Sequence, residues 1–373
     1  MTSSSGRPRL DSLDAFRGLT IAAMIVVSTP GTWDALYWPL DHAAWNGWTP
    51  TDLIFPFLLF AMGAAVPVAL SRRRASARPV HHHVMRRAVV LFGLGLVLNA
   101  IQAAPPLHLA SFRILGVLQR IAIVYVAVAW LTERTSRRTQ LGVTLAILIG
   151  YWALMMLVPV PGVGAGVLTP DGNLASFLDR LLLGRHLAHP QWESEGLLST
   201  IPSIATAFAG VFAADWLTRA GSVRHRSGWL AAAGVAITAL GLLWDRVFPI
   251  NKNLWTSSFV LLSGGLAMFV LAACHWILDV RRWRLGSTAF LALGRNALTA
   301  YVLSVGLDAV VTRWPVDASG ASVKWALYWY GFGSWSAQCC DPRAASLAYA
   351  LAYTALWGAI MTVMYRRRIF IGV

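Results

Sequence analysis

The stretch LDHAAWNGWTPTDLIFPF, residues 40–57, decides the class of fold and raises the question of function. Its second half begins an apolar run of membrane-spanning length, and its first half places His42 and Asn46 just before that run. An apolar run of this length with few charges is typical of a transmembrane helix. A titratable histidine and a carboxamide at the edge of a bilayer indicate a polar site at that edge.

The composition of the whole chain agrees with this start. Of its 373 residues, 57% are hydrophobic and 13% are charged, which is about half the charged share of a soluble domain. We therefore predict a single all-α domain over 1–373, a polytopic membrane helix bundle of about ten transmembrane helices with functional outer loops. The predicted spans are 14–30, 51–71, 86–104, 112–132, 139–158, 196–218, 228–247, 254–278, 287–311 and 344–365.

Positive charge predicts how the bundle is oriented. Most Lys and Arg residues fall in alternate connecting segments, for example 72–74 and 281–284. The positive-inside rule then puts both termini in the cytoplasm, with residues 1–13 as a cytoplasmic leader, in an inner cell membrane. The net charge of +15 therefore does not indicate a nucleic-acid partner. The long outer loops are 31–50, 159–195 and 312–343, and the last contains an aromatic, interfacial segment at 322–335.

Several motifs that suggest ligand sites have simpler explanations. The three cysteines, Cys274, Cys339 and Cys340, form neither a disulfide framework nor a paired metal motif. The run HHH at 81–83 lies in a basic inner segment with no acidic residue or cysteine nearby in the sequence, so no metal site is expected. The run GVGAG at 162–166 predicts a turn, because no strand-to-helix junction surrounds it.

Three arginines, Arg17, Arg120 and Arg295, lie within predicted spans and away from the two residues at each span end. A charge there costs at least about 2.5 kcal/mol unless it finds a partner or water. Asp14 lies three residues before Arg17, so this arginine either forms a local ion pair or contacts a phosphate of a bound cofactor. Arg120 and its neighbour Gln119 favour a polar cavity. For Arg295, bonding between helices explains the position equally well.

Residues before the second span carry the candidate chemistry. A neutral His42 imidazole can accept a proton from a substrate amine, although a surface histidine bonded to a backbone carbonyl would look the same in sequence. Asn46 could stabilise an oxyanion or bind a sugar hydroxyl. Asp52 also has a structural explanation, since Thr49-Pro50-Thr51-Asp52 is the pattern of a capped helix start.

Two further polar segments fall on the same predicted side. PINKNLW, residues 249–255, groups Asn251, Lys252 and Asn253 beside an aromatic anchor, which also suits interfacial anchoring. WESEG, residues 192–196, offers Glu195 as a helix cap or as a partner for a cation or amine.

Several of these segments together resemble a known family. They are RLDSLDAFRGLTIAAMIVVSTPG (9–31), HAAWNGWTPTDLIFPFLLFAMG (42–63), RILGVLQRIAIVYV (113–126), EGLLSTIPSIATAFAG (195–210) and PINKNLWTSSFVL (249–261). In this order they are similar to the heparan-α-glucosaminide N-acetyltransferase family and its bacterial relatives. The match runs from residue 9 to the C-terminus.

The resemblance implies a membrane-embedded acetyltransferase. Acetyl-CoA would enter from the cytoplasm, and the acetyl group would pass to the amino group of a glucosamine-type sugar on the other side. With the residues considered above, the predicted site residues are His42, Asn46 and Asp52 for catalysis; Ser28, Arg17, Gln119 and Arg120 for the donor; and Trp45, Glu195, Asn251, Lys252 and Asn253 for the acceptor. Lipid is the other expected partner, and a homodimer is implied by analogy.

One position departs from the family, which usually has asparagine near the end of the first span, where this chain has Ser28. A single hydroxyl, or a water, would then have to contact the acetyl carbonyl. The sequence does not choose between direct attack by the amine and an acetyl-His42 relay.

Two other functions stay open at this point. One is a transporter for amino sugars that uses the polar residues within the spans, although the chain has no convincing internal repeat. The other is an O-acetyltransferase of envelope polysaccharide, which would share the donor and differ in the acceptor.

Overall fold

The computed structural model describes residues 10–75, 79–103, 108–219, 221–316, 320–334, 336 and 341–371. The described part is helical, and its only β-structure is two isolated bridges. Its α-helices are α1 (Asp11–Ser28), α2 (Ile54–Ala75), α3 (Val80–Ala103), α4 (Val117–Arg134), α5 (Arg137–Leu157), α6 (Leu174–Leu183), α7 (Leu197–Leu217), α8 (Val223–Trp244), α9 (Ser257–His275), α10 (Ser287–Arg295), α11 (Ala297–Arg313), α12 (Val323–Tyr328) and α14 (Pro342–Arg366). The predicted all-α membrane bundle is confirmed.

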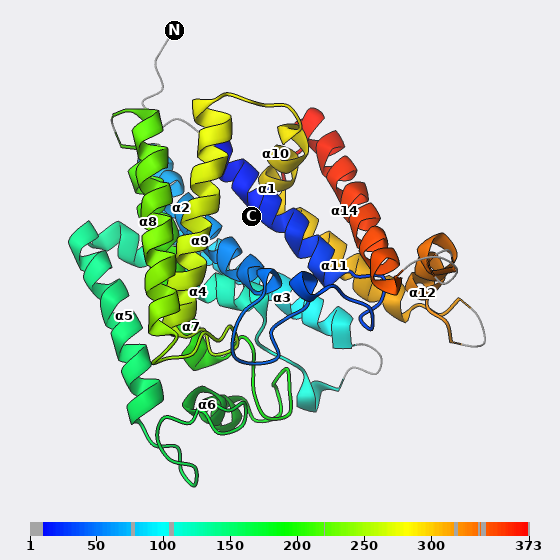
Figure 1. Cartoon of the computed structure of the whole chain (residues 1–373), viewed down its shortest axis with the longest axis horizontal. Coiled ribbons are helices and arrows are strands. Elements are labelled where there is room, and N and C mark those ends of the chain that lie inside the picture. Colours follow the sequence, from blue (N-terminus) through cyan, green and yellow to red (C-terminus); the bar gives the residue numbers. More distant parts are fainter. Residues whose placement is uncertain are drawn as a thin grey trace.

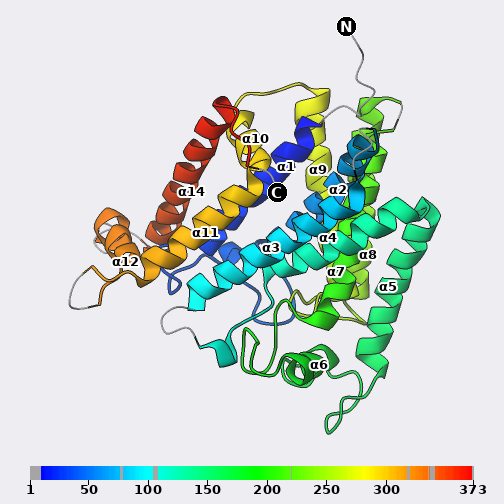
Figure 2. The same ribbon diagram turned by 180° about the vertical axis from the view of Figure 1, so that it is seen from behind.

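The bundle has inner and outer helices (Figures 1 and 2). In α7 and α9, 67% of the most apolar stretch is buried, against 22% in α5 and α8. A helix that is apolar all round and buried belongs to the core, whereas an exposed apolar face suits lipid. The closest helix pairs are α8 with α9, α2 with α7, α1 with α10 and α3 with α4.

Helix α2 approaches α7 closely through two glycines. A Cβ atom on Gly63 would lie 1.9 Å from the carbonyl oxygen of Ala207, and one on Gly210 would lie 2.0 Å from that of Phe60. Small residues of this kind let helix backbones touch in membranes. The contact fixes α2 and α7 relative to each other, and the predicted site residues Asp52 and Glu195 each lie two residues before one of these helices.

Seven described helices are long and apolar enough to cross a membrane, or eight if one bent pair counts as a span. Each of the ten predicted ranges coincides with a helix or a helix pair. However, α1 and α4 each have only 18 residues, and each includes three charged side chains. The number ten is therefore not confirmed.

The predicted span 287–311 is not one continuous helix but two helices, α10 and α11, that meet at an angle of 86°. The break falls at Asn296, which is buried. Its Nδ2 atom donates to the Ile369 carbonyl at 3.2 Å, and its Oδ1 atom accepts from the Ile371 amide at 3.1 Å. These bonds to a segment 73 and 75 residues away hold the bend.

Two predicted outer loops contain helices. The loop 159–195 includes α6, whose N-cap residue Asn173 accepts from the Ser176 amide at 2.8 Å. The segment 322–335 includes α12 and a π-helical turn, Trp329–Gly333. Residues 162–166 form a turn as predicted, with three glycines at positive φ. Cys339, Cys340 and most of the predicted leader, residues 1–9, lie outside the described residues.

We call one end of the bundle the loop end. There α1, α3, α5 and α8 finish and α2, α4, α7 and α9 begin, next to the segments 29–53, 158–196 and 245–256 (Figure 1, lower half). The other end, where α1 begins and α2 finishes, is called the opposite end.

Candidate active site

A cavity of about 620 Å³ opens at the loop end, and we call it the loop-end cavity. Eight of the predicted site residues line it: Ser28, His42, Trp45, Asp52, Gln119, Glu195, Lys252 and Asn253. They come from four separate parts of the sequence. The structure thus brings most of the predicted site into one place.

His42, Asp52 and Lys252 form a compact charged group. The Nδ1 atom of His42 lies 2.7 Å from Oδ1 of Asp52, and the Lys252 ammonium lies 3.3 Å from the same oxygen. The Lys252 nitrogen is also 3.1 Å from Nδ1 and 3.5 Å from Nε2 of His42. A carboxylate at Nδ1 favours the proton on that nitrogen, which leaves Nε2 free to accept one.

Asp52 is almost fully buried, and the start of the second span holds it in place. Its Oδ2 atom accepts from the backbone amides of Thr49 at 3.0 Å and Ala43 at 3.1 Å. The predicted cap is confirmed, with Thr49 as N-cap and Pro50 in the first turn. One carboxylate therefore caps the helix with one oxygen and orients His42 with the other.

Lys252 sits in the turn before α9. Burial lowers the pKa of its ammonium below the usual value, while the charges of Asp52 and Glu195 act in the opposite direction. Trp255 of the same turn has φ 52° although it is not glycine, and its buried indole donates to Thr206 Oγ1 at 3.1 Å. A bulky residue in this conformation persists only where its surroundings fix it. The turn that carries Lys252 is thus tied to the core.

Asn46 and Asn251 connect the two loops that carry the charged group. The Nδ2 atom of Asn251 donates to Oδ1 of Asn46 at 3.1 Å, and its own Oδ1 accepts from the Leu254 amide at 2.9 Å. Asn251 is completely buried. Neither asparagine lines the loop-end cavity, although Asn46 lines a shallower hollow beside His42.

Aromatic rings form one wall of the cavity. The indole nitrogen of Trp45 donates to the Leu168 carbonyl at 2.7 Å, and its ring meets Trp192 edge-on at 5.3 Å between centroids. Trp192 in turn stacks on His189 at 4.0 Å. Trp192 and His189 both line the cavity, and the sequence did not single them out as site residues.

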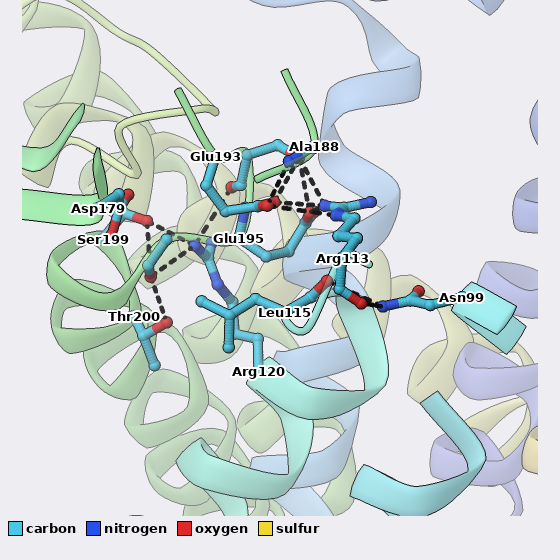
Figure 3. A network of polar contacts seen from close by, with 12 residues as sticks. Asn99, Arg113, Leu115, Arg120, Asp179, Ala188, Glu193, Glu195, Ser199 and Thr200 are labelled. Carbon is cyan, nitrogen blue, oxygen red and sulfur yellow. Dashed lines mark hydrogen bonds and ion pairs between the residues drawn. The ribbon is translucent and has the colours of Figure 1, made fainter. Parts of the chain in front are cut away.

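An ion network contributes Arg113, Ser194 and Glu195 to the lining of the same cavity (Figure 3). Arg113 pairs with both Glu193 and Glu195, and Ser194 Oγ donates to Glu195 at 2.6 Å. Burial alone would raise the pKa of Glu195, but Arg113 and Arg120 lower it below its usual value. The same carboxylates raise the pKa of Arg113 against the effect of burial. Glu195 therefore remains an anion at the cavity wall.

Arg120 is completely buried in α4 and does not line the cavity. Its Nη2 atom donates to Ser199 Oγ at 2.5 Å and to the Ser194 carbonyl at 3.2 Å, and its guanidinium lies 4.8 Å from the centre of the Trp255 ring. Arg120 thus holds the segment 194–199 against the core, which makes it a positioning residue for Glu195.

Asp179 of α6 supports the same segment from the other side. Its Oδ1 atom accepts from the Leu197 amide at 2.9 Å, at the first turn of α7 (Figure 3). Burial raises the pKa of Asp179 to about 6, although the Leu197 amide lowers it. The helix that the sequence did not predict therefore anchors the start of α7.

A second cavity, of about 320 Å³, lies toward the opposite end. Three arginines line it, Arg17, Arg87 and Arg295, and we call it the arginine cavity. Arg17 lies 3.6 Å from Asp14, so the predicted ion pair is confirmed. Arg295 lies 3.4 Å from Asp14 as well. The Nε atom of Arg87 has no hydrogen-bond partner within the described residues.

The two cavities share three lining residues: Val117, Leu118 and Tyr301. Beside them, Gln119 is 1% exposed, and its Nε2 donors find no partner in the described part of the chain. A Cβ atom on Gly95 would lie only 2.3 Å from Gln119 Oε1, so glycine there makes room for the carboxamide. An unpaired buried donor at a junction of cavities is a candidate ligand contact.

Long-range pairing explains which cavity residues the sequence did not reveal. Arg113 falls at the start of the predicted span 112–132, far in the sequence from Glu193, and Asp308 and Lys324, 2.9 Å apart, fall in different predicted elements. Asn99 holds the backbone before α4 through the carbonyls of Arg113 and Leu115. The two glutamates of WESEG, Glu193 and Glu195, were the one feature of the sequence that pointed to this pairing. Two neighbouring carboxylates that become buried need a cation nearby.

Fold and site define a polytopic helical membrane protein with a histidine–carboxylate pair at the edge of a cavity that adjoins a second, arginine-lined one. Comparison with known proteins agrees. The family described as "Heparan-alpha-glucosaminide N-acetyltransferase, catalytic" matches residues 9–244. The chain is 30% identical over 419 residues to the human heparan-alpha-glucosaminide N-acetyltransferase, covering 97% of this chain and 60% of that protein. The mouse protein of the same name is 29% identical over 427 residues, covering 99% and 61%.

The chain therefore belongs to this family, and the resemblance seen in the sequence is confirmed. It spans about 60% of the length of these two relatives.

Proposed function

We propose that this protein transfers an acetyl group from acetyl-CoA to the amino group of a glucosamine-type sugar. The donor would enter from the opposite end, which faces the cytoplasm, and the sugar would bind at the loop end, outside the inner membrane. The observation that carries the proposal is the junction of the two cavities at Val117, Leu118 and Tyr301. Family membership supports the acetyl transfer.

The arginine cavity suits the charged part of the donor. Arg17, Arg87 and Arg295 could bind phosphate groups, since guanidinium groups recognise phosphate in bidentate fashion. The slender pantetheine arm carries amide carbonyls that need donors when they leave water. The unpaired Gln119 Nε2 supplies such a donor where the cavities meet.

The loop-end cavity suits an amino sugar. The Trp45 and Trp192 rings offer an apolar wall. Glu195 offers an anion that can pair with the sugar amine while the amine is still protonated, as it enters the cavity. Lys252 and Asn253 add donors for hydroxyl groups. Ser28, also in the wall, is near the end of α1 and would face the acetyl group.

The proposed chemistry needs one base and one site for negative charge. The neutral amine attacks the thioester carbonyl, and His42 Nε2 takes the proton that the nitrogen loses. The Lys252 ammonium stabilises the oxyanion of the tetrahedral intermediate. The C–S bond then breaks, the thiolate leaves and takes up the proton from His42, and the products are the N-acetyl sugar and CoA.

A transfer assay tests the proposal. Purified protein in nanodiscs receives labelled acetyl-CoA and glucosamine, and label is followed into N-acetylglucosamine for the wild type and His42→Ala. We expect transfer by the wild type and loss in the variant. Label in an alkali-labile ester would instead indicate O-acetylation. Sugar binding without any binding of acetyl-CoA would indicate a transporter.

The order of steps is tested separately. Protein incubated with acetyl-CoA alone is digested and analysed by mass spectrometry. A peptide carrying acetyl-His42 would support a covalent relay. An active preparation that never shows it would support direct transfer.

A further inference from the structure

A second, larger hollow adjoins the loop-end cavity. It is an open groove of about 1130 Å³ between residues 31–35, helix α12 and the start of α14. It shares Trp33, Thr312 and Lys324 with the loop-end cavity, so the two form one continuous surface. In Figure 1, α12 lies at the right-hand edge of the bundle, beside the ends of α11 and α14.

The groove is lined with aromatic rings held in fixed positions. Trp325 and Trp329 stack with an interplanar angle of 9° and centroids 5.8 Å apart. Trp325 lies on α12, which is capped because Ser322 Oγ accepts from the Trp325 amide at 3.1 Å, and Trp329 begins the π-helical turn that follows. Trp33, on the side nearest the cavity, is 60% exposed. Exposed, flat apolar faces of this kind stack against the C–H faces of sugar rings.

The lining is too polar to be a lipid-facing aromatic belt. It includes Asp34 and Asp341 as well as Lys324 and Arg343. Charged side chains are excluded from lipid contact by their desolvation cost. The groove therefore faces water and suits a solute that is amphipathic along its whole length.

The charges of the groove are balanced, and this limits the kind of chain it can bind. The lining includes two carboxylates and two cations, and Lys324 is already paired with Asp308 at 2.9 Å. Recognition of sulfate groups relies on clusters of unpaired arginine or lysine. Arg343 alone is no such cluster, whereas Asp34 and Asp341 can accept from hydroxyl or amino groups.

We propose that this groove binds the sugar units that follow the reactive amino sugar, and that the acceptor is an oligosaccharide whose further units are uncharged or carry amino groups. The inference rests on the proposed function, because it takes the reactive sugar to lie in the loop-end cavity. Beyond the proposed function, the inference specifies that the acceptor has more than one sugar unit and that its further units carry no negative charge. A sulfated chain is the wrong acceptor for this groove.

The first experiment compares three acceptors by kcat/KM for acetyl transfer: glucosamine, its β-1,4-linked tetrasaccharide, and a sulfated tetrasaccharide ending in glucosamine. The variants are Trp325→Ala and Trp329→Ala, which both change the groove and not the loop-end cavity. The matched control is Trp283→Ala, since Trp283 is 63% exposed and lies between α9 and α10, far from the groove in the sequence. Two groove variants are used so that the test still gives a result if one of them does not fold.

We expect the tetrasaccharide to exceed glucosamine by about tenfold in kcat/KM, since roughly 1.4 kcal/mol corresponds to tenfold. Trp325→Ala and Trp329→Ala should lose most of this gain and keep the glucosamine rate, because neither residue lines the loop-end cavity, while Trp283→Ala behaves as wild type. Equal kcat/KM for both acceptors, or preference for the sulfated chain, would overturn the proposal.

Calorimetric titration of the neutral tetrasaccharide without donor separates this proposal from the proposed function. If no acceptor is acetylated but the wild type binds the tetrasaccharide more tightly than both groove variants, the groove is supported and the acetyl transfer is wrong. Equal affinity in the wild type and both variants would contradict the groove, whatever the transfer assay shows.

Discussion

The imidazole of His42 and the carboxylate of Asp52 face each other at 2.7 Å across the turn that leads into α2. Asp52 is buried, whereas 53% of the His42 side chain is exposed. A buried, oriented anion behind an accessible imidazole is the arrangement in which a histidine acts as a base. The following predictions begin from this pair.

Replacing His42 by alanine should abolish transfer without unfolding the protein. We expect kcat to fall about 10²–10⁴-fold, the range for loss of a general base, because His42 is the imidazole that contacts both Asp52 and Lys252 in the described part of the chain. The melting temperature should change little, since the side chain is half exposed. His108→Ala, at another exposed histidine of the loop end, is the control. An active His42→Ala variant would assign the base elsewhere.

The substitution Asp52→Asn should separate orientation from capping. Asparagine can still accept from the Thr49 amide, but it cannot hold the His42 imidazole as an anion does, so kcat should fall on the order of a hundredfold or more. Thr49→Ala removes the N-cap side chain and should cost about 1 kcal/mol in the free energy of unfolding, with kcat retained. If both variants lose stability and activity in proportion, Asp52 is only a cap.

The glycine at position 95 should matter for the donor and not for the sugar. In Gly95→Ala the new methyl group displaces the Gln119 carboxamide, so we expect KM for acetyl-CoA to rise several-fold while KM for glucosamine is unchanged. Gly93→Ala on the same helix is the control, because a Cβ atom there meets nothing within 4 Å. Initial rates with each substrate varied in turn provide the test. A rise in the glucosamine KM alone would place Gln119 in the acceptor site.

Asp179 should make stability depend on pH with a defined sign. Its pKa is raised from 3.8 to about 6, so the folded state binds a proton that the unfolded state has lost. The stabilisation from this group is complete below pH 3.8 and is lost as the pH rises through about 6.

Melting temperatures in nanodiscs between pH 4 and 7 measure this effect. Asp179→Asn should gain stability relative to wild type across that interval, while Asp171→Asn, in an exposed turn, should show no such trend. A constant difference between Asp179→Asn and wild type at every pH would show that Asp179 is ionised throughout.

The buried guanidinium of Arg120 should tolerate no replacement by lysine. Lysine cannot reproduce both the bond to Ser199 and the position over the Trp255 ring. We expect Arg120→Lys to lower the free energy of unfolding by about 2–4 kcal/mol, measured by denaturation in mixed micelles. The exposed Arg185→Lys is the control. Unchanged stability together with a higher KM for acetyl-CoA would make Arg120 a donor contact instead.

Local pattern was sufficient to predict the helices and to select residues that line the loop-end cavity. Apolar runs predicted helix positions because membrane spans are long and uniform, and the Thr49–Asp52 cap could be read from four adjacent residues. His42, Lys252 and Glu195 were found because polar groups beside apolar spans are costly to keep.

Contacts between distant segments could not be predicted in this way. The bend at Asn296 depends on bonds to Ile369 and Ile371, and α6 is too short and too one-sided for a span pattern. The role of Arg120 was also hidden, since the sequence shows a charge within a span but not whether it faces a cavity or the core. Trp325 appeared only as interfacial, because a groove exists only once α12 and α14 are in place.

The bend at Asn296 also has a practical consequence for preparing the protein. Its side chain fixes residues 369–371, and Ile371 lines the arginine cavity. A purification tag fused after Val373 would begin two residues from that lining, next to the proposed entry of the donor. Histidine-rich tags can carry positive charge. Such a tag would change the apparent affinity for acetyl-CoA, either by competing with the three arginines for the phosphates or by adding to their attraction. Donor affinities should therefore be compared before and after tag removal, or measured with the tag placed on an internal loop.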